Sequence, residues 1–320
     1  MIPIKIVVPD GYTLNPGDLD WSELHALGDT FIYDHSTPEA LVERAQDADI
    51  VLANKVKLGA DILAQLPSLK LIAVTATGYN NIDIAAARQR GIAVCNVSGY
   101  GTTAVAQHVF SLLLEMTNRV YEHHLSVQAG DWSRCRDFCY TLSPIIELEG
   151  RTMGIYGFGR IGRQVALLAQ AFGMHVLATH KHPERDAMPG VEFVSLPTLF
   201  SASDVVSLHA PLTEENRGIV NEALLRTMRP GAMLINTGRG DLIAEQDLRR
   251  VLDEGWLGGA ALDVLSQEPP PADHPLIGAP RCLITPHNAW AGQQARRRLL
   301  HETILNIRAF LAGEARNSVA

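Results

Sequence analysis

The sequence predicts an α/β fold that is built on two parallel β-sheets. At roughly 150 residues per domain, a chain of 320 residues forms about two domains. Short runs rich in Val, Ile and Leu alternate with amphipathic helical stretches along most of the chain, which is typical of βαβ units and parallel sheets. This rhythm is interrupted once, over residues 130–150, and then restarts. The strands therefore fall into two groups.

The first group of strands lies in the N-terminal hundred residues. We expect strands over residues 4–8, 50–53, 71–75 and 93–95. Helices are expected over 38–48, where Thr37 is a suitable N-cap, and over 84–90, which Gly91 would end. One long helix is then expected over 102–124, because apolar residues recur at helical spacing between positions 105 and 116.

The second group of strands begins after the interruption. We expect strands over residues 152–156, 174–179, 191–194, 205–208, 233–236, 259–263 and 282–285, and a closing helix over 293–311. The irregular stretch 130–150 is long enough to be a functional loop or an interaction surface. Its part from Trp132 to Tyr140 is more hydrophobic than a free loop requires, so we expect a subunit contact there.

Composition excludes several classes of protein. The chain is 47% hydrophobic, contains four cysteines and has a formal net charge of −8. These values argue against an intrinsically disordered chain, a disulfide scaffold and a protein that neutralises nucleic-acid phosphates. No run approaches 18 uninterrupted apolar residues, and the N-terminus lacks a signal-peptide pattern. We therefore expect a cytoplasmic protein without membrane or nucleic-acid partners.

A glycine-rich turn follows the expected strand 152–156. Gly157, Gly159 and Gly162 form the pattern GxGxxG, and a helical stretch over 164–172 comes next. This context is that of a dinucleotide-binding fingerprint, in which the glycines allow a tight turn, a close approach to pyrophosphate and close helix packing. The alternative is an ordinary structural turn. The sequence favours a Rossmann-like domain that binds NAD(P)H.

The end of the next expected strand bears on the choice of cofactor. An acidic residue about 20 residues after the glycines would bind the adenosine ribose, but Thr179 and His180 occupy the strand end. Lys181 and Arg185 instead offer positive charge where a 2′-phosphate would lie. We therefore expect NADP(H) to be used at least as well as NAD(H). The alternative is that these cations only belong to a solvated turn.

Three polar clusters follow later strands of the same group. Arg239 lies between glycines and could hold a carboxylate with two parallel hydrogen bonds. His287 could supply a proton near neutral pH, and Glu268 could orient its ring. Each residue alone would pass as a surface charge, a turn residue or a structural histidine, but together they predict a reductase site. Cys135 and Cys139 lack a second ligand pair, so no metal site is expected.

The glycine turn together with residues 236–240, 263–269 and 286–290 resembles the D-isomer-specific 2-hydroxyacid dehydrogenase family. The resemblance covers nearly the whole chain. Residues 132–140 and 145–148 are most similar to the glycerate dehydrogenases, or hydroxypyruvate reductases, of that family.

The resemblance implies a role for each matching residue. His287 would be the acid/base residue, Glu268 its partner and Arg239 the group that binds the substrate carboxylate and carbonyl. Thr77, Gly78 and Asn54 would contribute to substrate binding. The cofactor would contact the glycine turn and eight further residues: Arg160, Ile161, His209, Ala210, Pro211, Thr237, Gly238 and Asp263, the last through the nicotinamide carboxamide. His180 and Lys181 depart from the acidic strand end of the family, and we expect them to contact the cofactor because of their position at the strand end.

The resemblance also implies the domain organisation and the activity. A discontinuous, flavodoxin-like substrate domain would comprise residues 1–100 and 287–320, and an NAD-binding Rossmann domain residues 101–286, with the active-site cleft between them. A homodimer is implied too. The expected reaction is hydride transfer between a nicotinamide and C2 of a 2-oxo or 2-hydroxy acid, most specifically hydroxypyruvate and glycerate. The alternatives are a glyoxylate or other 2-oxo acid reductase, and a nicotinamide-sensing transcriptional corepressor.

Overall fold

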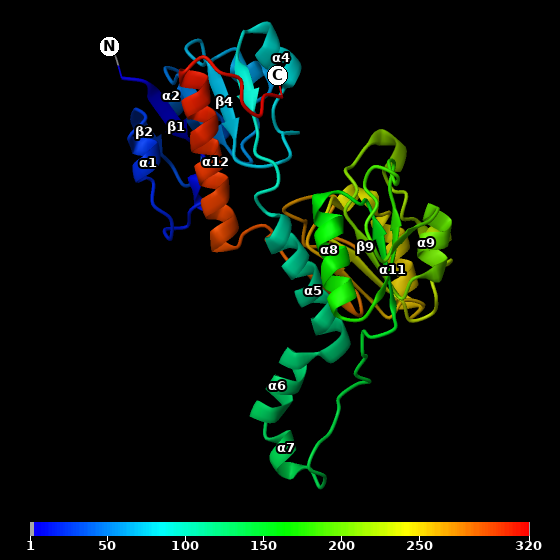
Figure 1. Ribbon diagram of the computed structural model, residues 1–320. Coiled ribbons are helices and arrows are strands. Elements are labelled where there is room, and N and C mark those ends of the chain that lie inside the picture. Colours follow the sequence, from blue (N-terminus) through cyan, green and yellow to red (C-terminus); the bar gives the residue numbers. More distant parts are fainter. Residues whose placement is uncertain (1–2, 320) are drawn as a thin grey trace. The chain divides into compact units, whose positions relative to one another are not determined.

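A computed structural model describes residues 3–319 (Figure 1). They form two compact units, each with its own parallel sheet. The first unit runs up to Gly101 and resumes at Trp290, and the second comprises Thr102–Ala289. The prediction of two parallel α/β sheets is confirmed.

The first unit has a five-stranded sheet in the order β2-β1-β3-β4-β5. Its strands are β1 (Lys5–Val8), β2 (Asp29–Ile32), β3 (Ile50–Ala53), β4 (Leu71–Val74) and β5 (Ala93–Cys95). Strands β3 and β4 are buried along their whole length. Strand β2 was missing from the sequence-based prediction. It lies at the sheet edge, and its four residues are exposed or half-buried, so it lacks the apolar run by which the buried strands were recognised.

Helices cover this sheet: α1 (Ser22–His25), α2 (Pro38–Ala45), α3 (Ala60–Leu63), α4 (Ile84–Gln89) and the C-terminal α12 (Gln293–Leu311), with a 3₁₀ turn, η1 (Gly11–Thr13). The Thr37 hydroxyl accepts a hydrogen bond from the Ala40 N–H and caps α2 as predicted, although the helix ends at Ala45 rather than at residue 48. Helix α12, near the C-terminus, lies beside strands from the N-terminal part of the chain (Figure 1). Its Leu299 and Ile307 belong to the same core as Ile6 of β1.

The second unit has a seven-stranded parallel sheet in the order β12-β11-β10-β9-β6-β7-β8. Its strands are β6 (Thr152–Tyr156), β7 (His175–Thr179), β8 (Val191–Phe193), β9 (Val205–Leu208), β10 (Met233–Asn236), β11 (Gly259–Leu262) and β12 (Cys282–Ile284). All seven strands were predicted within a residue at each end.

Two hydrophobic cores fill this unit. Its helices are α5 (Thr102–Asn118), α6 (Val120–Gln128), α7 (Asp131–Arg134), α8 (Arg160–Ala171), α9 (Leu196–Ala202), α10 (Glu222–Leu225) and α11 (Glu245–Asp253), with 3₁₀ turns η2 (Glu214–Asn216) and η3 (Gly240–Leu242). Val109 of α5 and Val165 of α8 share a core with Ile155 of β6. Leu248 of α11 and Leu234 of β10 belong to the other hydrophobic core of this unit.

The prediction of a single helix over 102–124 is wrong. The helix ends at Asn118, Arg119 takes a left-handed conformation with φ 46°, and α6 starts at Val120. Helix α5 has seven buried residues, whereas α6 has none, because α6 and α7 extend away from the sheet of their unit (Figure 1). The stretch 130–150, expected to be irregular throughout, contains the short helix α7, and the residues from there to β6 are irregular. Within residues 3–319, no helix is both long and apolar enough to cross a membrane.

Candidate active site

The polar residues singled out in the second unit lie along one edge of its sheet. Because its strands are all parallel, the residues that follow them collect at the carboxyl edge. These are Gly157 after β6, His180 after β7, His209 after β9, Thr237 and Arg239 after β10, Asp263 and Glu268 after β11, and His287 after β12. The order along the chain reverses between the neighbouring strands β6 and β9, and ligands of open α/β sheets bind at such a point.

The glycine turn has the close contacts of a dinucleotide fingerprint. Gly157 has φ 98°, and a Cβ there would lie 2.3 Å from the Ala210 backbone nitrogen. A Cβ on Gly162 would lie 2.3 Å from the Gly157 carbonyl oxygen, so only glycine lets α8 approach the turn. A Cβ on Gly159 would meet open space at the start of α8. That space adjoins the N–H groups of a helix N-terminus, which attract phosphate.

Two buried polar atoms beside this turn have unused hydrogen-bonding capacity. Among the described residues, His209 Nδ1 and Thr237 Oγ1 have no hydrogen-bond partner. His209 Nε2 pairs with the Ser207 hydroxyl at 2.8 Å, and burial lowers the pKa of His209 to about 4, so the ring is neutral. Buried polar atoms normally have partners. Together with the space over Gly159, these atoms fit a bound nicotinamide dinucleotide.

Other predicted cofactor contacts flank the turn. Ile161 packs against the core beneath α8, and Arg160 is the first residue of that helix. Pro211 follows β9, and its carbonyl accepts a hydrogen bond from the Asn216 side chain at 2.8 Å. A Cβ on Gly238 would lie 3.2 Å from the Leu208 carbonyl, so the turn after β10 lies against the end of β9.

His180 at the end of β7 is paired with an acid that the sequence analysis missed. Its Nε2 lies 2.7 Å from a carboxylate oxygen of Asp186, which also accepts hydrogen bonds from Arg185. Arg163 of α8 contacts the same carboxylate at 3.5 Å. The hydrogen bonds from Arg185 and then His180 lower the pKa of Asp186 to about 2. Lys181 is exposed and has no carboxylate partner within residues 3–319.

The turn that carries Arg239 is organised by a buried amide. Asn236 is fully buried at the end of β10; its side chain donates to the Arg239 carbonyl at 2.8 Å and accepts from the Gly238 N–H at 3.0 Å. Arg239 Nη1 donates to the Gly238 carbonyl. The guanidinium is exposed and has no carboxylate partner in the described part of the chain. It is available for an anionic ligand.

Glu268 and His287, which are 19 residues apart, are brought together. His287 Nδ1 lies 2.6 Å from Glu268 Oε2, and the other carboxylate oxygen accepts the Leu265 N–H at 3.1 Å. A carboxylate can only accept, so Nδ1 carries the proton of this hydrogen bond. The His287 and Glu268 side chains are 28% and 34% exposed, so the pair is accessible to a ligand.

Asp263 holds the loop on which His287 lies. Its side chain is 1% exposed and accepts hydrogen bonds from the Thr285 hydroxyl at 2.6 Å and from the N–H groups of Asn288 and Ala289 at 2.9 and 3.0 Å. His287 itself has φ 50°, and its N–H donates to the Asp263 carbonyl at 2.8 Å. This left-handed conformation is unfavourable for a residue with a side chain, so the surrounding hydrogen bonds must maintain it.

The predicted substrate-binding residues belong to the first unit. Asn54 follows β3; its Nδ2 donates to the Thr75 carbonyl at 2.8 Å, while its buried Oδ1 has no partner among the described residues. Asp10, which the sequence analysis did not single out, accepts the N–H groups of Asn54, Lys55 and Val56. Thr77 and Gly78 follow β4, and the Thr77 hydroxyl donates to the Val97 carbonyl at 2.9 Å.

Comparisons with known proteins agree with this arrangement. A family model described as "D-isomer specific 2-hydroxyacid dehydrogenase, NAD binding domain" matches residues 110–289. The chain is 43% identical over 321 aligned positions to a hydroxypyruvate reductase of Blautia hydrogenotrophica, covering 99% of each chain. It is 42% identical over 285 positions to a glycerate dehydrogenase of Methylorubrum extorquens, covering 88% of this chain and 89% of the other.

A solved structure shows the same architecture. The crystal structure of a D-lactate dehydrogenase from Aquifex aeolicus, complexed with NAD and lactic acid, superposes with a TM-score of 0.82 at 27% identity and covers 97% of this chain and 96% of that one. With the family model matching more than half of the chain and the relatives nearly all of it, this chain belongs to the D-isomer-specific 2-hydroxyacid dehydrogenases, a family of oxidoreductases that bind a nicotinamide cofactor.

Proposed function

We propose that this enzyme interconverts hydroxypyruvate and D-glycerate. The observation that carries the proposal is the Glu268–His287 pair at the same sheet edge as the Arg239 guanidinium, which has no carboxylate partner among the described residues. The names of the two relatives, hydroxypyruvate reductase and glycerate dehydrogenase, support this choice of substrate within the family.

In this proposal three side chains divide the chemistry. A nicotinamide cofactor held at the glycine turn would supply or accept the hydride at C2 of the substrate. Arg239 binds the substrate carboxylate through two parallel hydrogen bonds and polarises the neighbouring carbonyl. His287 donates its Nε2 proton to the oxygen that becomes the hydroxyl, and Glu268, bonded to Nδ1, stabilises the positive charge of the ring. In the oxidation of glycerate, His287 takes the proton back.

The remaining predicted residues bind the ligands. We assign the dinucleotide to the glycine turn, with Arg160 and Ile161 at the pyrophosphate, His209 and Pro211 at the adenosine, Thr237 and Gly238 at the nicotinamide ribose and Asp263 at the carboxamide. We assign a substrate-binding role to the first unit, through the backbone around Thr77 and Gly78 and through Asn54. The unused Oδ1 of Asn54 supports its part in this assignment.

The test is an assay of purified enzyme with hydroxypyruvate, glyoxylate and pyruvate, followed by the loss of NAD(P)H absorbance. We expect the highest kcat/KM with hydroxypyruvate. A higher kcat/KM with glyoxylate or pyruvate would overturn the choice of substrate but not the family. No NAD(P)H oxidation with any of the three would argue for a protein that senses the cofactor without catalysis.

For the cofactor, we propose that NADP(H) is used at least as well as NAD(H). Arg163 and Arg185 both contact the Asp186 carboxylate, and Lys181 has no carboxylate partner within residues 3–319, so positive charge remains after pairing. This excess favours the 2′-phosphate of NADP(H). We expect kcat/KM for NADPH to equal or exceed that for NADH, and Lys181→Ala to lower the NADPH value selectively. A more than tenfold preference of the wild-type enzyme for NADH would contradict this.

We also propose that the enzyme is a homodimer in the cytoplasm. Large apolar side chains on and after α6 and α7 are exposed, among them Tyr121 (64%), Leu125 (50%), Trp132 (52%) and Phe138 (88%). A segment that exposes several large apolar side chains is typical of a protein interface. All four cysteines are unpaired, which suits a reducing compartment.

Light scattering during gel filtration tests the dimer. We expect twice the chain mass of 34.9 kDa for the wild type. We expect the double variant Tyr121→Asp/Phe138→Asp to elute as a folded monomer, because two carboxylates would have to be buried at the interface. A wild-type mass near 35 kDa would exclude the dimer.

A further inference from the structure

A second carboxylate, that of Glu245, holds the turn on which Glu268 lies. Glu245 is the first residue of α11, and its Oε1 accepts the Ser266 N–H at 2.8 Å. Its Oε2 accepts the Ser266 hydroxyl. Both hydrogen bonds reach a residue only two positions before Glu268. The helix is thus tied directly to the turn that presents the partner of His287.

His274 fixes the Glu245 carboxylate in turn. The Leu276 backbone N–H points at His274 Nδ1 at 3.3 Å, so Nδ1 is an acceptor and the proton of the neutral ring is on Nε2. Nε2 lies 3.0 Å from Glu245 Oε2 and donates to it. The His274 and Glu245 side chains are only 4% and 11% exposed. The carboxylate therefore has three donors in place and little contact with water.

Gly240 packs closely against the same turn, at Leu265 and Ser266. A Cβ at Gly240 would lie 1.9 Å from the Leu265 carbonyl carbon and 2.3 Å from the Ser266 nitrogen, so the peptide between these residues packs directly on the backbone beside Arg239. The backbone N–H of Leu265, the first residue of this pair, donates a hydrogen bond to the Glu268 carboxylate. Displacing the Leu265–Ser266 peptide would therefore displace the Glu268 carboxylate.

We propose that Glu245 is a positioning residue for the Glu268–His287 pair, and that His274 locks it in place. This inference rests on the proposed role of His287. Without the Glu245 carboxylate, the Ser266 N–H and hydroxyl lose their acceptor and the turn is free to shift. The Glu268 carboxylate then leaves His287 Nδ1. The ring is no longer held with its proton on Nδ1 and its Nε2 toward the substrate.

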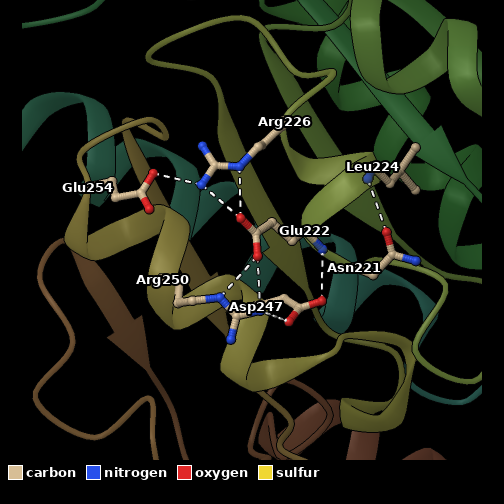
Figure 2. A network of polar contacts seen from close by, with 7 residues as sticks. All are labelled: Asn221, Glu222, Leu224, Arg226, Asp247, Arg250 and Glu254. Atoms are coloured by element: carbon tan, nitrogen blue, oxygen red, sulfur yellow. Dashed lines mark hydrogen bonds and ion pairs between the residues drawn. The ribbon is translucent and has the colours of Figure 1, made fainter.

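Asp247 provides a matched control, because it is also an acid in the first turn of α11. It belongs to a separate network on the surface of α10 and α11, where it accepts the Glu222 N–H at 2.9 Å and pairs with Arg250 (Figure 2). Arg226 joins Glu222 to Glu254 in the same network (Figure 2). Loss of either acid removes negative charge from the N-terminus of α11, but only loss of Glu245 frees the turn at Ser266.

The experiment that decides is nitrogen-15 NMR of the full-length protein without substrate, at alkaline pH, where imidazole rings are neutral. The nitrogen shifts report which His287 nitrogen carries the proton. We expect mainly Nδ1–H in the wild type and in Asp247→Ala, and a large Nε2–H fraction in Glu245→Ala. This measurement does not depend on turnover, so it tests the inference even if hydroxypyruvate is not the substrate. Equal tautomer populations in Glu245→Ala and Asp247→Ala would overturn it.

Kinetics provide the second measurement. We expect Glu245→Ala to lower kcat by about tenfold to a hundredfold, with the KM for NAD(P)H unchanged, and Asp247→Ala to leave kcat within about twofold. In a Glu268→Ala background, the same Glu245→Ala change should cost little more, because no side chain then joins the turn to His287 Nδ1. Full additivity of the two changes would overturn the proposal. If Glu245→Ala does not fold, Ser266→Ala serves instead, with a smaller shift in the same direction.

Discussion

Replacing His287 by alanine should reduce kcat by about a hundredfold to ten-thousandfold in the reduction of hydroxypyruvate, the range typical for loss of a general acid. The variant keeps Arg239 and the glycine turn, so the KM values for substrate and cofactor should change much less. This expectation follows from the geometry. His287 Nδ1 donates its hydrogen bond to Glu268 at 2.6 Å, so Nε2 is the nitrogen proposed to exchange a proton with the substrate.

Glu268→Gln is the companion variant. Its amide can still accept from Nδ1, but it no longer offsets the charge of the protonated ring, so we expect a smaller loss of kcat than in His287→Ala. His301→Ala, on the exposed face of α12, is the control for loss of a histidine and should be active. Near-wild-type kcat in His287→Ala would refute the assignment of the acid/base residue.

Replacing Arg239 by alanine should raise the KM for hydroxypyruvate by about a hundredfold, because hydrogen bonds to a charged group contribute about 1.5–3 kcal/mol. We expect a smaller fall in kcat, since the guanidinium also polarises the substrate carbonyl. The KM for NAD(P)H should be nearly unchanged. Steady-state kinetics with each substrate varied in turn separate these effects.

Arg239→Lys sharpens the test. Lysine keeps the charge but cannot form two parallel hydrogen bonds to one carboxylate, so the KM should lie between those of the wild type and the alanine variant. If Arg239→Ala bound hydroxypyruvate as well as the wild type, the substrate carboxylate would have to be held elsewhere. If Lys restored binding completely, the guanidinium would act only as a charge.

The features that could be predicted from the sequence are those encoded within a few neighbouring residues. Buried parallel strands are continuous apolar runs, and all those of the second unit were found within a residue at each end. The glycine turn was recognisable because its spacing and its place between a strand and a helix occur together. Glu268 and His287 were identified as residue types at strand ends and by family resemblance. Their 2.6 Å contact required the fold.

What the sequence could not predict depends on contacts across space. The edge strand β2 has no buried side chain, and the apolar spacing up to residue 116 gave no sign of the break at Arg119. Asp186 lies six residues beyond His180, in a turn of mixed charge, so its carboxylate could not be assigned to the end of β7. Glu245 looked like any acid in the first turn of a helix. Its contacts with Ser266 and His274 distinguish it from Asp247.

The hydrogen bonds of Asp263 have one more consequence. They reach Asn288 and Ala289, and the second unit ends at Ala289. His287, Glu268 and Arg239 all precede that boundary, so the three side chains proposed to exchange the proton and to hold the substrate with a guanidinium all follow strands of one sheet. The proposed proton chemistry therefore belongs to a single compact unit. Exchange of the first unit for that of a relative should change which acid is accepted while the proton donor stays intact.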